Sequence, residues 1–375
     1  MGTLAVVGGG AIGLGVAWRA AEAGWSVTVF DPAIGSGASW VAGGMLAPLS
    51  EGWPGEERVL EFGAAALARW PEFAARLDAE SGVNVCVADE TLTVALDAAD
   101  AADLRTIADW VGGRAAAGGG ALDGVGSDLR VLDRAGVREL EPALARTVRA
   151  GLLATAEPAI DNRRLLDGLR KACAAAGVRI RAEAVENLDL DFDQIVLAAG
   201  AASARLRPEL PVRPVKGEIL RLRHRPGATP VPRRVIRARV HGRPVYLVPR
   251  GDGIVVGATQ YEAGFDTTVT VGGVRDLIAD AEAILPGIGE YELSEASAGS
   301  RPGSPDNLPL IGRLTGRLVV ATGHGRNGML TTPLTVDAVL GELAGSPLPA
   351  ARSADPRRFS TPSASDFSSS LGGIR

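Results

Sequence analysis

TLAVVGGGAIG, residues 3–13, is the stretch of sequence that decides the fold. Its apolar start predicts a strand, and the G-x-G-x-x-G pattern that follows is typical of the turn that leads into the helix of a dinucleotide-binding βαβ unit. Gly8 allows the tight turn, Gly10 lets the backbone approach a pyrophosphate, and Gly13 lets the helix pack on the strand. The amino end of this helix would then face the anion.

A second strand and an acidic residue follow at the expected spacing. The run at 27–30 predicts a strand, and it ends in Asp31, 23 positions after Gly8, where an acceptor for ribose hydroxyls is expected. The loops at 35–39 and 42–48 are rich in Gly, Ser and Ala, which lets backbone N–H groups come close to a ligand. A nicotinamide dehydrogenase would move straight into its next helix, so this pattern favours FAD over NAD.

The next part of the chain alternates helical and strand patterns. Residues 58–80 predict a helix, 83–96 predict strands, and 97–111 predict a helix followed by a loop at 112–126. The apolar run at 194–200 suits the interior of a parallel sheet, far along the chain from the first βαβ unit. The nucleotide-binding domain is therefore predicted to be discontinuous.

A β-rich stretch follows, and it predicts a second domain. Strands are expected at 214–223, 234–240, 244–249 and 253–258, with a hairpin turn before the last of them. The predicted fold class is α/β: a discontinuous Rossmann-like FAD-binding domain and a second α+β substrate domain on a mainly antiparallel sheet. The FAD-binding domain is assigned residues 1–80, 150–212 and 295–360, the substrate domain 81–149 and 213–294, and a disordered tail 361–375.

Composition excludes several classes of protein. The 39 basic and 44 acidic residues give a net charge of −5, which favours neither nucleic acid nor an anionic membrane as a partner. Two distant cysteines, Cys86 and Cys173, and three scattered histidines predict no metal site and no disulfide framework. The first residues lack the basic start of a signal peptide, so a cytoplasmic protein is expected.

Two segments near the carboxyl end carry candidate functional residues. Residues 301–312 (RPGSPDNLPLIG) are interpreted as a loop, and residues 323–329 (GHGRNGM) join an apolar strand to a helix. The second segment would offer backbone donors at the start of a helix, which can stabilise negative charge on a reduced flavin ring. Arg301 and Arg326 are candidates for holding a substrate carboxylate, because a guanidinium matches its two oxygens.

Taken together, the chain resembles the glycine oxidases of the thiamine pathway, within the superfamily of FAD-dependent amine and D-amino-acid oxidases. The order and spacing of the motifs carry this resemblance over nearly the whole chain. The motifs are GGGAIG at 8–13, AGGMLAP at 42–48, PVKGE at 214–218, VYLVPR…VVGAT at 245–259, RPGSPDNLPLIG at 301–312 and GHGRNGM at 323–329.

The resemblance implies FAD and assigns roles to individual residues. Monomeric sarcosine oxidases attach their flavin to a cysteine in the C-terminal half, whereas both cysteines here lie before residue 174, so the flavin is expected to be noncovalent. Arg301 would bind the amino-acid carboxylate with Arg326 close by, and Tyr246 would project toward the substrate. The implied FAD-binding residues, with those of the glycine-rich turn, are Gly8, Gly10, Ala11, Ile12, Gly13, Asp31, Pro32, Ala38, Ser39, Gly43, Gly44, Met45, Val185, His324, Gly325, Arg326, Asn327, Gly328, Met329 and Leu330.

The implied reaction is oxidative deamination of glycine and other small amines or D-amino acids, by hydride transfer to flavin. It yields glyoxylate or another 2-oxo acid, ammonia or an amine, and hydrogen peroxide, with oxygen as acceptor, in the thiazole branch of thiamine biosynthesis. A D-amino-acid dehydrogenase, a sarcosine oxidase-like enzyme and a non-catalytic FAD-binding protein stay open as alternatives. Gln260 and Gly325 depart from the family pattern, so the preferred amine is open, as is a homo-oligomeric state.

Overall fold

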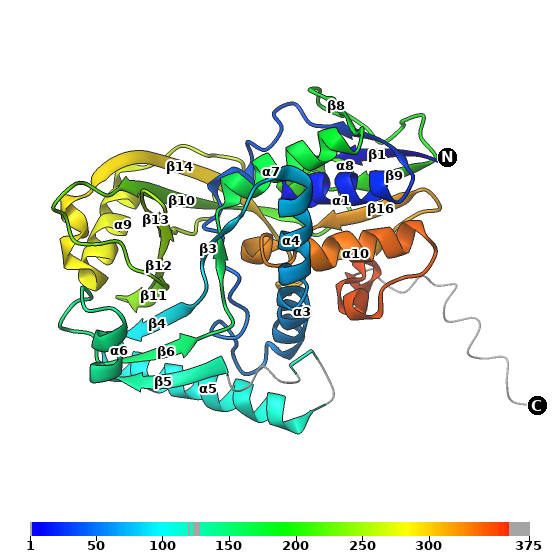
Figure 1. The fold of residues 1–375 in the computed structure, drawn as a ribbon. Helices are drawn as coiled ribbons and strands as arrows, with labels where there is room; N and C mark the ends of the chain where they lie inside the picture. The colour runs from blue at the N-terminus through cyan, green and yellow to red at the C-terminus, as the bar shows by residue number, and fades with distance from the viewer. Residues whose placement is uncertain (1, 119–120, 123–127, 360–375) are drawn as a thin grey trace, which may run out of the picture.

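The computed structural model describes residues 2–118, 121–122 and 128–359. Two sheets organise these residues, and Figure 1 shows them on opposite sides of the molecule, joined by the long strands β10 and β14. The α/β fold class expected from the sequence is confirmed, because one sheet is mainly parallel and the other mainly antiparallel.

The first sheet has six strands and is built around the apolar run that opens the chain. Every neighbouring pair in it is parallel except β15 with β16. Its central strands are buried on both faces, which is why they consist of apolar residues without alternation. The strand order is β15 (Leu310–Arg313), β16 (Leu318–Thr322), β9 (Gln194–Leu197), β1 (Thr3–Val7), β2 (Ser26–Phe30) and β8 (Arg179–Arg181).

Helices cover this sheet and bury the largest hydrophobic core. Trp18 on the first helix packs edge-on against Phe73, and the same core includes Leu4, Leu165 and Leu334. The pieces of this layer come from the beginning, the middle and the end of the chain. They are α1 (Ala11–Glu22), α2 (Ala38–Val41), α3 (Glu57–Leu67), α4 (Trp70–Ser81), α7 (Asn162–Ala175) and α10 (Thr332–Leu343).

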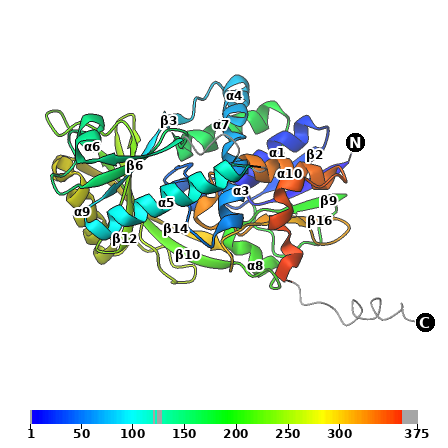
Figure 2. The same ribbon diagram turned by 90° about the horizontal axis from the view of Figure 1, so that it is seen from below.

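The second sheet has eight strands, and only β4 and β11 within it run parallel. Helix α9 packs on one end of this sheet, and Figure 2 shows α5 running along its strands at the other. The strand order is β14 (Glu292–Gly303), β10 (Arg213–Arg223), β13 (Gly253–Gly257), β12 (Arg243–Arg250), β11 (Val235–Val240), β4 (Thr91–Ala95), β6 (Ala150–Ala154) and β5 (Leu129–Asp133). The helices of this part are α5 (Ala98–Ala117), α6 (Arg134–Leu140) and α9 (Val271–Ile284). A separate pair of short strands consists of β3 (Cys86–Ala88) and β7 (Ala159–Ile160).

Three sequence predictions need correction. The helix expected over 58–80 is two helices, because Pro71 has no N–H to donate and stands in the first turn of α4. The loop expected from 112 starts too early, since α5 continues to Ala117 despite two glycines. The segment 301–312 is not simply a loop: residues 301–303 end β14, where they pair with β10.

The predicted domain boundaries differ from the sheets at two strands. Strand β6 and residues 295–303 of β14 fall in segments assigned to the FAD-binding domain, yet both strands form hydrogen bonds in the eight-stranded sheet. The predicted tail at 361–375 lies outside the described residues. Among the residues described, no helix combines the length and the apolar character that a bilayer crossing demands.

Candidate active site

A large cavity of about 1360 Å³ takes its walls from elements of both sheets. Of the predicted site residues, all but two line it; Gly13 lies beneath the turn and Leu330 lies in the core and in a smaller pocket. The structure therefore brings together segments that are more than 300 residues apart in sequence. The predicted residues on the cavity wall are Gly8, Gly10, Ala11, Ile12, Asp31, Pro32, Ala38, Ser39, Gly43, Gly44, Met45, Val185, Tyr246, Arg301, His324, Gly325, Arg326, Asn327, Gly328 and Met329.

The glycine-rich turn has no room for side chains. Gly8 adopts a φ of +113°, and a Cβ there would lie 2.3 Å from the carbonyl oxygen of Ala198. A Cβ on Gly13 would lie 1.9 Å from the carbonyl oxygen of Gly8. Gly10 begins α1 and has no side chain to cap it; the hydroxyl of Ser39 accepts from the N–H of Ala11 at 3.1 Å, and the amino end of the helix otherwise opens onto the cavity. This is the geometry in which helix N–H groups and the helix dipole bind a pyrophosphate.

Asp31 ties this turn to the end of β2. One carboxylate oxygen accepts a hydrogen bond from the N–H of Gly9 at 2.6 Å, and the other accepts from the N–H of Ala33 at 2.7 Å. The sequence predicts contact with ribose hydroxyls, and the structure adds this second use of the same carboxylate. Because each oxygen has two lone pairs, both uses are compatible.

Buried polar residues that the sequence analysis did not single out hold the small-residue loop in place. Asn162 donates from its amide nitrogen to the carbonyl oxygens of Ser39 (2.9 Å) and Trp40 (2.7 Å). Arg250 donates to the carbonyl oxygen of Gly43 at 2.9 Å. Gly44 has a φ of +84°, and a Cβ on it would lie 2.0 Å from a backbone oxygen of β7. The loop is thus held by residues of α7, β7 and β12.

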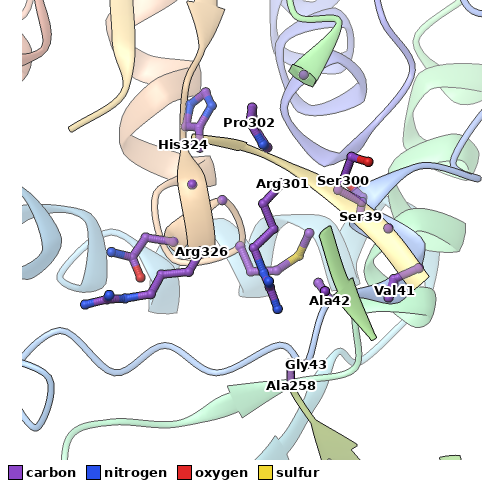
Figure 3. Close-up of a pocket in the computed structure, with 18 of the residues that line it drawn as sticks. Ser39, Val41, Ala42, Gly43, Ala258, Ser300, Arg301, Pro302, His324 and Arg326 are labelled. Carbon is purple, nitrogen blue, oxygen red and sulfur yellow. The ribbon is translucent and has the colours of Figure 1, made fainter. Parts of the chain in front are cut away.

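Arg301 extends from β14 into the cavity. Figure 3 shows its side chain pointing toward Gly43 and Ala258, which also line the cavity. The guanidinium lies against Gly217, where a Cβ would come within 2.3 Å of its nitrogens, and it donates to the carbonyl oxygen of Thr259 at 3.2 Å. Among the described residues, no acidic side chain forms an ion pair with it. An unneutralised guanidinium in a cavity is suited to a carboxylate ligand.

Arg326 lines the same cavity but already forms an ion pair. Its Nε lies 2.9 Å from a carboxylate oxygen of Glu51, and the other oxygen of Glu51 lies 2.8 Å from Arg237. Burial raises the pKa of Glu51, but the two guanidinium groups outweigh it and hold that pKa below its usual value. Figure 3 shows Arg326 directed away from Ala42. Glu51, which lies six positions after Met45, was not predicted from the sequence.

Tyr246 faces the cavity from β12. Its ring fills the space that side chains would need at Gly43 and Gly257, with hypothetical Cβ contacts of 2.8 and 2.3 Å. Desolvation raises the pKa of its hydroxyl, and the charge of Arg301 opposes this without reversing it. The phenol is therefore neutral near pH 7 and can donate a hydrogen bond to a ligand.

His324 is buried and neutral. Burial lowers its pKa to about 3, and its Nε2 lies 3.1 Å from the hydroxyl oxygen of Thr335. That hydroxyl donates its own hydrogen to the carbonyl of Thr331 at 2.8 Å, so it accepts from an Nε2–H of His324. The histidine therefore orients the turn before α10 and carries no charge into the cavity.

Glu157 provides a prediction about pH. It is fully buried, and burial raises its pKa to about 7 although the backbone N–H and hydroxyl of Ser50 and the N–H of Leu49 donate to it. Between pH 4.5 and 7 the folded protein then binds more protons at this group than the unfolded chain, so this group lowers stability as pH rises through that window. In the wild-type protein the free energy of unfolding should fall by about 3 kcal/mol through this window because of Glu157, and Glu157→Gln should abolish that fall.

The measurement is the free energy of unfolding of the FAD-loaded protein in urea at pH 5 and pH 8. His324 contributes an opposite slope below pH 6.5, but both proteins share it, so the difference between wild type and variant isolates Glu157. Glu72→Gln, at an exposed carboxyl on α4, is the control and should leave the difference between the two pH values unchanged. An equal pH dependence in wild type and Glu157→Gln would contradict the assignment.

The chain matches a known protein family over most of its length. The family model described as FAD dependent oxidoreductase matches residues 3–339. The chain belongs to this family. Its cofactor is FAD, and the glycine-rich turn, the open helix end and the size of the cavity fit that group. Two relatives with 33–34% identity extend over most of the chain, so the resemblance found in the sequence is confirmed.

The relatives of this FAD dependent oxidoreductase agree with one another. A putative thiamine biosynthesis oxidoreductase ThiO from Rhizobium etli is 33% identical over 90% of this chain and 94% of its own. A glycine oxidase from Pseudomonas aeruginosa is 34% identical over 88% of this chain and 91% of its own. The crystal structure of glycine oxidase from Geobacillus kaustophilus matches with a TM-score of 0.85 and 27% identity, covering 96% of this chain and all of that one.

Proposed function

We propose that this protein oxidises glycine and other small amines or D-amino acids to the corresponding 2-oxo acid. For glycine the balanced reaction is glycine + O₂ + H₂O → glyoxylate + NH₃ + H₂O₂. The observation that carries the proposal is the unneutralised guanidinium of Arg301, which faces a cavity whose other end has the geometry of a dinucleotide site. The relatives named glycine oxidase and ThiO support the substrate and a place in thiamine biosynthesis.

The chain's residues hold the substrate at one end of the site. When bound, FAD supplies the two-electron acceptor for the hydride that leaves the α-carbon. Arg301 binds the substrate carboxylate with two N–H donors, while the carbonyl of Thr259 takes a third. Tyr246 offers a neutral hydroxyl beside it. The substrate amine binds deprotonated, so catalysis depends on positioning and electrostatics, without a side chain acting as acid or base.

A panel of substrates tests this function. Glycine, sarcosine and D-alanine are offered to the purified holoenzyme, and turnover is read both by hydrogen peroxide release and by reduction of an artificial dye. The proposal expects one peroxide for each glyoxylate formed from glycine. Dye reduction without peroxide would instead indicate a dehydrogenase, and no turnover of any amine would indicate a protein that only binds FAD.

The flavin is proposed to be noncovalent. Cys86 lies on β3 and Cys173 is buried in α7, where burial raises its pKa to about 12, and neither lines the cavity. After acid precipitation we expect the yellow colour in the supernatant and a colourless pellet. A flavoprotein with a covalent flavin, treated in parallel, keeps its colour in the pellet. Yellow colour in the pellet of this protein would show a covalent link.

A further inference from the structure

The motif Pro214–Glu218 (PVKGE) has a role that the proposed reaction leaves unexplained. It lies on β10, so alternate side chains point to opposite faces. Gly217 faces the cavity, whereas Lys216 is only 2% exposed and Glu218 is fully buried on the other face. Lysine is rare in this chain, because 37 of its 39 basic residues are arginine. A buried lysine is therefore unusual in this chain and indicates a specific structural role at this position.

Lys216 binds the segment that closes this side of the cavity. This wall segment, residues 258–270, connects β13 to α9, and its residues Ala258, Gln260 and Phe265 line the cavity. The ammonium of Lys216 lies 2.8 Å from a carboxylate oxygen of Asp266 in the wall segment. The backbones of Lys216 and Tyr261 also exchange two hydrogen bonds, of 2.9 and 3.0 Å.

Glu218 holds both ends of the same segment. Its carboxylate accepts from the N–H of Thr270 at 2.8 Å and from the hydroxyl of Thr259 at 3.2 Å. The hydroxyl of Thr259 accepts in turn from the N–H of Glu218 at 2.8 Å. Lys216 lies 3.8 Å from Glu218, so one buried ammonium serves both carboxylates. The wall segment is thus attached at its beginning, its middle and its end.

The wall segment held by these contacts touches Arg301 at the carbonyl oxygen of Thr259. The carbonyl oxygen of Thr259 accepts the hydrogen bond from the guanidinium, and Gly217 provides the surface on which the guanidinium lies. The two residues on either side of Gly217 therefore fix the wall that orients Arg301. A shift of the wall segment would move the acceptor that aims the guanidinium, and misplacement by about 1 Å is enough to weaken a precisely oriented contact by a large factor.

We propose that Lys216 and Glu218 are positioning residues for carboxylate binding, which act by clamping the wall segment so that Thr259 orients Arg301. This rests on the proposed role of Arg301 in holding the substrate carboxylate. Asp266 is the exposed half of the clamp. Its hydrogen bond with Lys216 holds the pKa of Asp266 below the usual value, so the pair stays charged at neutral pH.

The test replaces the two partners of the ion pair in the clamp and measures carboxylate binding directly. Asp266→Ala and Lys216→Met holoenzymes are titrated with acetate, a carboxylate of glycine's size without the amine, and binding is followed by the change in flavin absorbance. The dissociation constant of acetate and the KM for glycine are expected to rise about tenfold or more, while kcat changes by less than about threefold and FAD content stays the same.

The control uses the chain's other lysine. Lys171 pairs with Asp167 at 2.9 Å on the surface of α7, so Asp167→Ala removes an ion pair of the same type far from the wall segment and should change neither constant. If both clamp variants keep the wild-type dissociation constant for acetate and the wild-type KM for glycine, the inference is overturned but the proposed function is not. If the wild-type holoenzyme itself binds no acetate, the proposed role of Arg301 fails and the inference falls with it.

Discussion

Arg301→Ala is expected to lower kcat/KM for glycine about a thousandfold, which corresponds to about 4 kcal/mol. The loss arises because the substrate carboxylate would enter the cavity without its charged partner, and losing one half of a desolvated, hydrogen-bonded charge pair costs 2–5 kcal/mol or more. Most of the change should appear in KM. The FAD content should stay at the wild-type level, because the contacts of Arg301 are with Gly217 and Thr259 and not with the glycine-rich turn. Peroxide release at varied glycine concentration measures the effect.

Arg239→Ala is the matched control for this prediction. Arg239 also lines the cavity, but its guanidinium is half exposed and paired with Asp103 at 3.0 Å. Exposed ion pairs contribute little, so we expect kcat/KM within about threefold of wild type. Equal activity of Arg301→Ala and wild type on glycine would show that another group binds the carboxylate.

Gly13→Ala is expected to raise the dissociation constant for FAD by about a hundredfold or more. The new methyl group would come within 1.9 Å of the carbonyl oxygen of Gly8, so the turn has to move. Gly8 is itself packed closely against the backbone of Ala198, the residue after β9, which limits how far the turn can move. Overpacking of this kind costs 1–3 kcal/mol, and it acts here on the backbone proposed to meet the pyrophosphate. Titration of the apoprotein with FAD, followed by flavin fluorescence, measures the change.

Gly113→Ala is the corresponding control. Gly113 also lies within a helix, α5, but nothing lies within 4 Å of the position its Cβ would take. Alanine there should stabilise the protein by about 0.8 kcal/mol through helix propensity and leave FAD binding unchanged. Wild-type affinity for FAD in Gly13→Ala would refute the assignment of this turn to the cofactor.

The sequence is most informative where local pattern determines structure. The glycine-rich turn could be predicted because each glycine has a local reason to be there, and the apolar runs at β1, β9 and β16 show parallel strands buried on both faces. Strand β14 was not predicted, because small and polar residues such as Ser297 and Ser300 alternate in it without an apolar face. Its backbone pairing with β10, rather than a pattern of side chains, fixes it as a strand.

The parts of the site that could not be predicted depend on long-range contacts. Asn162 and Arg250 reach the loop at 39–43 from more than a hundred residues away, and no local pattern marks them as its supports. Glu51 pairs with Arg326 across 275 residues, which changes an arginine from a candidate carboxylate ligand into part of an ion pair. In a chain with many arginines, only the position of the acidic partners shows which guanidinium is free to bind a ligand.

The central claim is that segments from both ends of the chain bind one FAD and present Arg301 to an amino-acid substrate. It is tested most directly by mixing the purified yellow holoenzyme with glycine in the absence of oxygen. The account predicts that the flavin absorbance bleaches, with about one glyoxylate formed for each bound FAD, and that it returns when oxygen is admitted. A protein that purifies colourless and does not take up FAD, or one whose flavin absorbance persists with glycine, would contradict it.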